Sequence, residues 1–177
     1  MKSPRYHPLL VSLHWLLAFL IALSLGMGMF SLQEIANSSP DKIFALRVHI
    51  IAGVLILVLT LVRFVVRFSA PRPEPASTNN NFLDRIAVIT HYGLYLLVVL
   101  MAASGIALSI QAGLPAIVFG GSGAPLPESF AIYAPRFAHG VLATLLLALA
   151  TLHVLAALYH QFVRRDGLLS RMWFGRS

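Results

Sequence analysis

The chain has 177 residues, of which 58% are hydrophobic and only 11% are charged. A water-soluble domain is roughly half apolar and a quarter charged, so these proportions exclude an ordinary soluble domain. The formal net charge is +7, but the basic residues flank long apolar runs, which argues for membrane topology and against nucleic-acid binding. The absence of cysteine excludes disulfides, thiolate-bound metal sites and covalently attached c-type haem.

Four apolar runs are each long enough to cross a bilayer, which takes about 20 residues. They predict an all-α integral membrane protein, a four-transmembrane-helix bundle forming one domain over residues 1–177. The expected helices cover about residues 7–30, 43–68, 82–110 and 136–163. The first run exceeds the apolar region of a signal peptide and no A-x-A-like cleavage site follows it, so we expect it to be retained.

The connections between these runs contain turn-forming residues. The second connection, residues 69–81, is rich in proline and asparagine and cannot continue a helix. The third, residues 111–135, contains four prolines and four glycines and is fairly apolar. We expect it either to lie on the membrane surface or to cap the bundle.

Lysine and arginine are distributed unequally between the two ends of the predicted bundle. Ten lie in the N-terminal arm, around the second connection or at the C-terminal end, and three, Lys42, Arg47 and Arg136, mark the opposite face. The positive-inside rule therefore predicts that both termini are cytoplasmic. In a bacterium this describes a multi-pass protein of the inner membrane.

Four histidines within the apolar runs fall into two depth-matched pairs. His139 and His153 are fourteen residues apart, which is roughly 21 Å along a helix and nearly the same helix face. Because successive helices run in opposite directions, His14 should lie level with His153 and His49 level with His139. Axial ligation of haem iron requires two imidazoles on facing helices at one depth. We interpret the two pairs as ligands of two stacked, non-covalently bound haems.

Other interpretations of these residues fit the pattern less well. A single intramembrane histidine could bond a backbone carbonyl or line a water-filled cavity, but two level-matched pairs are harder to explain in that way. A metal-ion transporter is disfavoured because the acidic residues lie near segment ends or in loops. Arg47 and Arg136 lie near the outer histidines, where they could contact a haem propionate, attract an anion or anchor the helices. Arg63 and Arg67 are interpreted as topology determinants, with propionate contact as the alternative.

Several segments carry a resemblance to a known family: HPLLVSLHWL, RVHIIAGVLILVLTLVRFVVRF, HYGLYLLVVLMAASG, and FAHG followed by LHVLAALYHQFVRRDGLL. Over nearly the whole chain, the sequence resembles the bacterial cytochrome b561 family. The resemblance implies a four-helix protein with two haems b that passes electrons between a membrane quinone and another redox partner. By motif position, its haem ligands fall on His14, His49, His139 and His153.

Two further histidines, His91 and His160, lie at the predicted cytoplasmic level. Quinone chemistry moves protons as well as electrons, and histidine titrates near physiological pH. We interpret these two residues as flanking a site for ubiquinone or a similar quinone, with packing at the membrane interface as the alternative.

The leading functional hypothesis is transmembrane electron transfer between this quinone and an outer-side redox partner. The resemblance admits superoxide as the electron donor, which would make the protein a quinone-linked oxidoreductase of the superoxide oxidase type. A second hypothesis is a b-type cytochrome anchor subunit of a larger dehydrogenase or hydrogenase, with residues 111–135 as the surface that binds the partner enzyme. A metal-ion transporter is the third.

Overall fold

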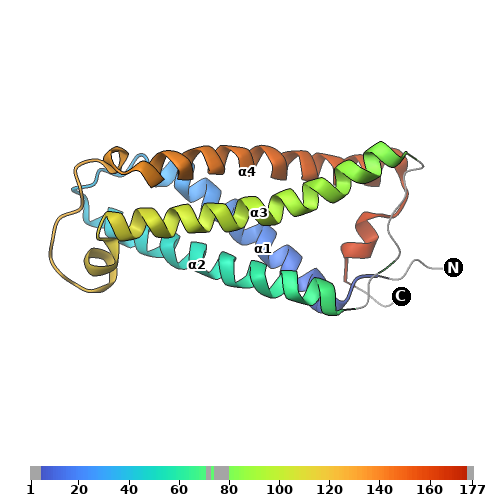
Figure 1. The fold of residues 1–177 in the computed structure, drawn as a ribbon, viewed down its shortest axis with the longest axis horizontal. Coiled ribbons are helices and arrows are strands. Elements are labelled where there is room, and N and C mark those ends of the chain that lie inside the picture. The colour runs from blue at the N-terminus through green and yellow to red at the C-terminus, as the bar shows by residue number, and fades with distance from the viewer. Residues whose placement is uncertain (1–4, 71–72, 74–79, 175–177) are drawn as a thin grey trace.

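The computed structural model describes residues 5–70, 73 and 80–174. Four long helices run side by side in an elongated bundle (Figure 1): α1 (Pro8–Gly26), α2 (Pro40–Ser69), α3 (Asn81–Gln111) and α4 (Ala134–Tyr159). Shorter turns accompany them: η1 (Met27–Ser31), η2 (Pro115–Phe119), η3 (Phe130–Ile132), η4 (His160–Arg164) and η5 (Leu169–Met172). Each long helix, with its π-helical extension where it has one, is long and apolar enough to cross a membrane. The predicted all-α, four-span fold is therefore confirmed.

At α2 and α3 the helix start is set by a capping residue that the sequence places just before the run. α2 begins at Pro40, about three residues before the expected start, because Ser39 Oγ accepts a hydrogen bond from the N–H of Asp41 (3.3 Å). Proline is tolerated at the first helical position because the backbone N–H that it lacks would have no partner within the helix there. At the start of α3, Asn80 Oδ1 accepts from the N–H of Phe82 (3.0 Å). These caps satisfy backbone donors that nothing in a lipid environment would otherwise satisfy.

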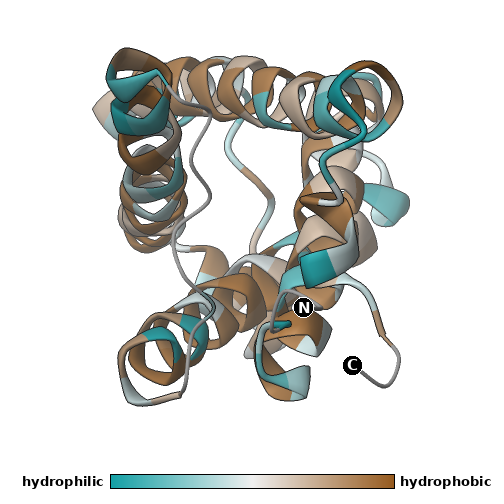
Figure 2. Ribbon diagram, turned by 90° about the vertical axis from the view of Figure 1, so that its right-hand side faces the viewer, coloured by the Kyte–Doolittle hydropathy of each residue, from teal (hydrophilic) through white to brown (hydrophobic). Residues whose placement is uncertain are grey.

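The helices pack in chain order around the bundle, α1 on α2, α2 on α3 and α3 on α4, and Figure 2 shows them end on at the corners of a square. Buried apolar side chains from all four helices meet in the middle of the bundle: Leu17, Leu25, Ile56, Val98 and Leu146. Large apolar side chains also cover the outward faces, where Phe19 is 64% exposed and Phe137 is 79% exposed. Such faces suit contact with lipid chains, as expected for helices in a bilayer.

One end of the bundle, which we call the loop end, is capped by the connection between α3 and α4. Val118 and Leu114 are buried there against Leu46 of α2. Asn37, in the connection between α1 and α2, donates a side-chain hydrogen bond to the carbonyl of Pro127 (2.8 Å). Of the two placements expected for residues 111–135, the structure therefore shows the cap.

The opposite end, which we call the termini end, holds both described ends of the chain (Figure 1). The N–H of Tyr6 donates to the carbonyl of Arg171 (3.2 Å), and Trp15 Nε1 donates to the carbonyl of Met172 (2.8 Å). The two described ends therefore share one face of the membrane. That this face is cytoplasmic stays a prediction, and three of the ten basic residues on which it rests, Lys2, Arg72 and Arg176, lie outside the described residues.

Candidate functional site

The structure brings the four paired histidines together as two facing couples. His14 of α1 and His153 of α4 have ring centres 6.3 Å apart, and His49 of α2 and His139 of α4 have ring centres 6.2 Å apart. In both couples the ring planes are inclined at 78°. The first couple lies toward the termini end and the second toward the loop end. These are the couples that helix geometry predicts from the sequence.

The separation of the rings suits one metal ion between each couple. A metal–imidazole bond is about 2.0–2.1 Å long and the ring centre lies roughly 1.1 Å behind the bonding nitrogen, so two rings on opposite sides of one ion are roughly 6.3 Å apart. The described residues contain no group of three or more histidine, cysteine or acidic side chains that could hold a metal ion. Two imidazoles are too few for a zinc site, which takes four ligands, whereas haem brings its other iron ligands with it. The donor set therefore fits haem better than a bare metal ion.

The loop-end couple has serine partners that orient its rings. Ser104 Oγ lies 3.0 Å from His139 Nδ1 and donates its own hydrogen to the carbonyl of Met101 (2.8 Å). Its oxygen is thus left to accept from His139 Nδ1–H, which directs the lone pair of Nε2 away from the serine. Ser24 Oγ lies 3.4 Å from His49 Nδ1, within hydrogen-bond distance.

The sequence alone does not assign a role to either serine. The sequence feature that could have pointed to them is a hydroxyl side chain within an apolar run, at the same depth as a histidine on a neighbouring helix. A glycine accompanies Ser104, and a Cβ at Gly105 would lie 3.0 Å from His139 Cε1. Glycine at this position therefore lets the imidazole lie against the backbone of α3.

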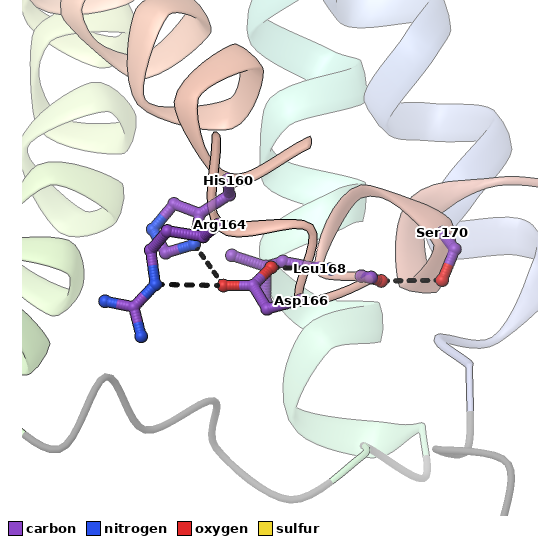
Figure 3. Close-up of polar contacts among 6 residues, drawn as sticks. His160, Arg164, Asp166, Leu168 and Ser170 are labelled. Carbon is purple, nitrogen blue, oxygen red and sulfur yellow. Dashed lines mark hydrogen bonds and ion pairs between the residues drawn. The ribbon is translucent and has the colours of Figure 1, made fainter. Parts of the chain in front are cut away.

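At the termini end, His91 and His160 have different partners. The ring centre of His91 lies 5.2 Å from that of His153, and His91 Nδ1–H donates to the carbonyl of Ala87 (2.6 Å). His160 begins the π-helical turn η4, and its Nδ1–H donates to a carboxylate oxygen of Asp166 (2.6 Å; Figure 3). Each bond leaves Nε2 as the other ring nitrogen available to a ligand.

Asp166 reaches His160 because the chain turns sharply after η4. Arg165 adopts a left-handed conformation with φ 53°, and Gly167 has φ 72°. Asp166 also accepts from the N–H of Leu168 (3.2 Å) and lies 3.5 Å from Arg164 Nε (Figure 3).

The hydrogen bonds of Asp166 also determine its protonation. Burial alone would raise the pKa of Asp166, but the hydrogen bonds from His160 and Leu168 and the charges of His160 and Arg164 outweigh this effect. The pKa is therefore lowered, and the carboxylate stays ionised at neutral pH. The sequence analysis did not single out Asp166. The feature that could have pointed to it is a carboxylate six residues after His160.

The outer basic residues are largely engaged by backbone carbonyls. Arg47 donates from Nη2 (2.6 Å) and Nε (3.1 Å) to the carbonyl of Val118. Lys42 is only 5% exposed, and its ammonium donates to the carbonyls of Leu32 and Ile35. Lys42 and Arg136 both line a pocket of about 390 Å³ at the loop end. The predicted propionate or anion contacts of Arg47 and Arg136 stay predictions.

The sequence is similar over nearly its whole length to known proteins. A family model described as prokaryotic cytochrome b561 matches residues 5–175. The chain is 29% identical to a cytochrome b562 of Cereibacter sphaeroides, covering 97% of this chain and 96% of that protein. It is 27% identical to a probable superoxide oxidase CybB of Yersinia pestis, over 95% of each chain. It is 30% identical to cytochrome b561 homolog 2 of Escherichia coli, over 95% of this chain and 90% of that protein.

Proposed function

The chain belongs to the prokaryotic cytochrome b561 family, and from this premise we propose that it carries electrons through two haems b between a membrane quinone and a partner on the other side. Membership and the four membrane-spanning helices make it a haem-binding, multi-pass electron-transport protein of the bacterial inner membrane. The number of haems, the quinone and the outer partner are the proposed part. The observation that carries the proposal is the presence of two histidine couples with nearly equal ring separations, one in each half of the bundle.

Each couple supplies what one haem needs from the protein. We assign His14 and His153 to the haem of the termini end, and His49 and His139 to the haem of the loop end. When bound, haem iron supplies one-electron transfer. The residues around it hold the imidazoles in place, and at the loop end Ser24 and Ser104 do so through Nδ1.

We place the quinone at the termini end, beside His91 and His160. Full reduction of a quinone takes up two electrons and two protons, so the site needs a group that exchanges protons near neutral pH. His160 suits this role because Asp166 holds its Nδ1–H, which leaves Nε2 to exchange a proton with a quinone oxygen. His91 is bonded to its own helix at Ala87, so we assign it to the wall of the site.

We propose superoxide as the electron donor at the loop end, in line with the name of the Yersinia pestis relative. The pocket lined by Lys42, Arg136 and Glu128 supports this because its two cations outnumber its one carboxylate, so that it would attract a small anion. In the balanced reaction, two superoxide ions each lose one electron and become dioxygen. The quinone gains both electrons and two protons and becomes quinol.

The test uses the purified chain alone in liposomes that contain ubiquinone. We expect superoxide generated outside to reduce the haems and then the quinone, with dioxygen released. Reduction of quinone without any partner subunit would also exclude an obligatory anchor role. Haems that superoxide cannot reduce, but that quinol reduces, would contradict the donor and leave the quinone link standing.

A further inference from the structure

Two arginines in the C-terminal part of α2 lie within its membrane-spanning segment and have no anionic partner among the described residues. Arg63 and Arg67 are one helical turn apart and both are partly buried. In each, Nε is buried and has no hydrogen-bond partner. A buried, unsatisfied donor on a charged group is costly, and more so in a membrane.

The contacts that these arginines do make are with neutral groups. A guanidinium nitrogen of Arg63 donates to the hydroxyl of Tyr95, and the guanidinium lies 5.4 Å from the centre of that ring. Arg67 lies 6.0 Å from the ring centre of Tyr92. Tyrosine rings favour nearby cations but do not neutralise them. The two ion pairs among the described residues both involve Asp166 and neither involves these arginines.

Both arginines lie near histidines of the termini end. Arg63 is close enough to His14 and His153 to interact with both electrostatically, and both Arg63 and Arg67 interact with His91 in the same way. The two guanidinium groups also repel each other. Arginine keeps its charge in proteins, so it cannot escape this cost by losing a proton.

We propose that Arg63 and Arg67 bind the propionate carboxylates of the haem held by His14 and His153. The inference rests on the proposed function, because it requires a haem at that couple. A guanidinium fork matches the geometry of a carboxylate and can bond through two parallel N–H groups. Propionates would supply both the missing negative charge and acceptors for the unsatisfied Nε–H groups.

The test compares Arg63→Gln and Arg67→Gln with Arg85→Gln, which removes an exposed arginine at the start of α3, at the same end of the bundle. Loss of a positive charge beside a haem favours the oxidised form. We therefore expect the midpoint potential of the termini-end haem to fall in Arg63→Gln and Arg67→Gln, with partial loss of that haem on purification. The loop-end haem and the Arg85→Gln variant should be unchanged.

Several controls keep the outcomes distinct. The loop-end haem reports on folding in every variant. Arg63→Lys keeps the positive charge but not the guanidinium fork. Compared with Arg63→Gln, it should bring the midpoint potential close to the wild-type value but recover less of the lost haem. An anionic lipid offers the same chemistry through its phosphate, so bound phospholipid is measured by mass spectrometry. If the arginine variants lose bound phospholipid while the midpoint potential and the haem retention of the termini-end haem stay unchanged, the proposal is overturned. It is also overturned if neither the haem properties nor the bound phospholipid change. A wild-type protein with fewer than two haems would instead contradict the proposed function itself.

Discussion

The two ends of the bundle hold similar histidine couples in different surroundings. At the loop end, serine hydroxyls lie at Nδ1 of His49 and His139. Lys42 and Arg47 donate hydrogen bonds to backbone carbonyls there. At the termini end, the couple has a third histidine against it and two arginines with unsatisfied donors nearby. The polar groups described at the loop end are thus mostly satisfied within the protein, whereas at the termini end Arg63 and Arg67 each keep a buried Nε–H without a partner.

This difference indicates that the two ends have different roles, electron transfer alone at the loop end and proton exchange at the termini end. A haem site with satisfied neighbours suits the passage of electrons alone, because nothing there needs to exchange a proton. Unsatisfied donors and a carboxylate-held histidine, His160, suit a site that takes up protons and binds further groups. The following predictions test whether the two ends are independent and whether only one of them handles protons.

The largest expected effect is the loss of one haem at a time. Replacing one imidazole removes an iron ligand, and no neighbouring side chain can take its place. We expect His14→Ala to abolish the termini-end haem and His49→Ala the loop-end haem, so each variant retains about half of the wild-type haem. The measurement is the haem-to-protein ratio together with a redox titration that tells the two haems apart. Loss of the same species in both variants would contradict the assignment of the couples.

The next effect concerns proton exchange at the termini end. His160→Ala should slow quinol-driven haem reduction on the order of 10²-fold, the usual contribution of a positioned acid–base group, while both haem spectra stay intact. Gln161→Ala, an exposed change in the same turn, is the matched control. His91→Ala should have a smaller effect because its Nδ1 is bonded to Ala87. Unchanged rates in both histidine variants would return these residues to a packing role.

Much of the histidine arrangement was accessible from the sequence because helix geometry alone fixes it. Fourteen residues on one helix determine both the depth and the face of His139 and His153, and alternating helix direction then selects their partners. The four spans follow equally directly from the length of the apolar runs. These features depend on the periodicity of the backbone and not on how neighbouring side chains pack.

The features that sequence reasoning missed depend on the rotation of helices or on local backbone turns. Whether Ser104 faces His139 depends on how α3 is turned against α4, which an apolar run does not encode. The contact between Asp166 and His160 requires the π-helical turn η4 and a left-handed Arg165. Likewise, both placements of residues 111–135 were compatible with their composition, and the packing of Val118 against α2 decides between them.

A moderate effect is expected from Asp166→Asn. A hydrogen bond to a charged group contributes about 1.5–3 kcal/mol, and about 1.4 kcal/mol of lost orientation corresponds to a tenfold slower step. We therefore expect quinol-driven haem reduction to slow on the order of tenfold, less than in His160→Ala. Asp166→Glu should recover part of the rate if the carboxylate orients the imidazole. Equal rates in the wild type and Asp166→Asn would show that His160 works without this partner.

The smallest effect should be a pH-dependent release of the C-terminal segment. Because the pKa of Asp166 is lowered in the folded protein, its bonds contribute stability above the ordinary aspartate value of about 3.9. That contribution is lost as the pH falls below this value and through the lowered pKa. The segment also contacts α1 through Trp173, whose ring centre lies 5.5 Å from that of Trp15. These are the two tryptophans of the chain, so their fluorescence reports directly on this contact.

We expect the wild-type fluorescence to change as the pH is lowered from about 5 to about 2, and this change to be reduced in Asp166→Asn, which has no carboxylate to protonate. Trp173→Phe, which removes the reporter on the segment, separates the signal of Trp15 from that of the contact. An identical pH profile in the wild type and Asp166→Asn would mean that the segment is held by the Trp15 contacts alone. In that case the role of Asp166 at the termini end would be limited to His160.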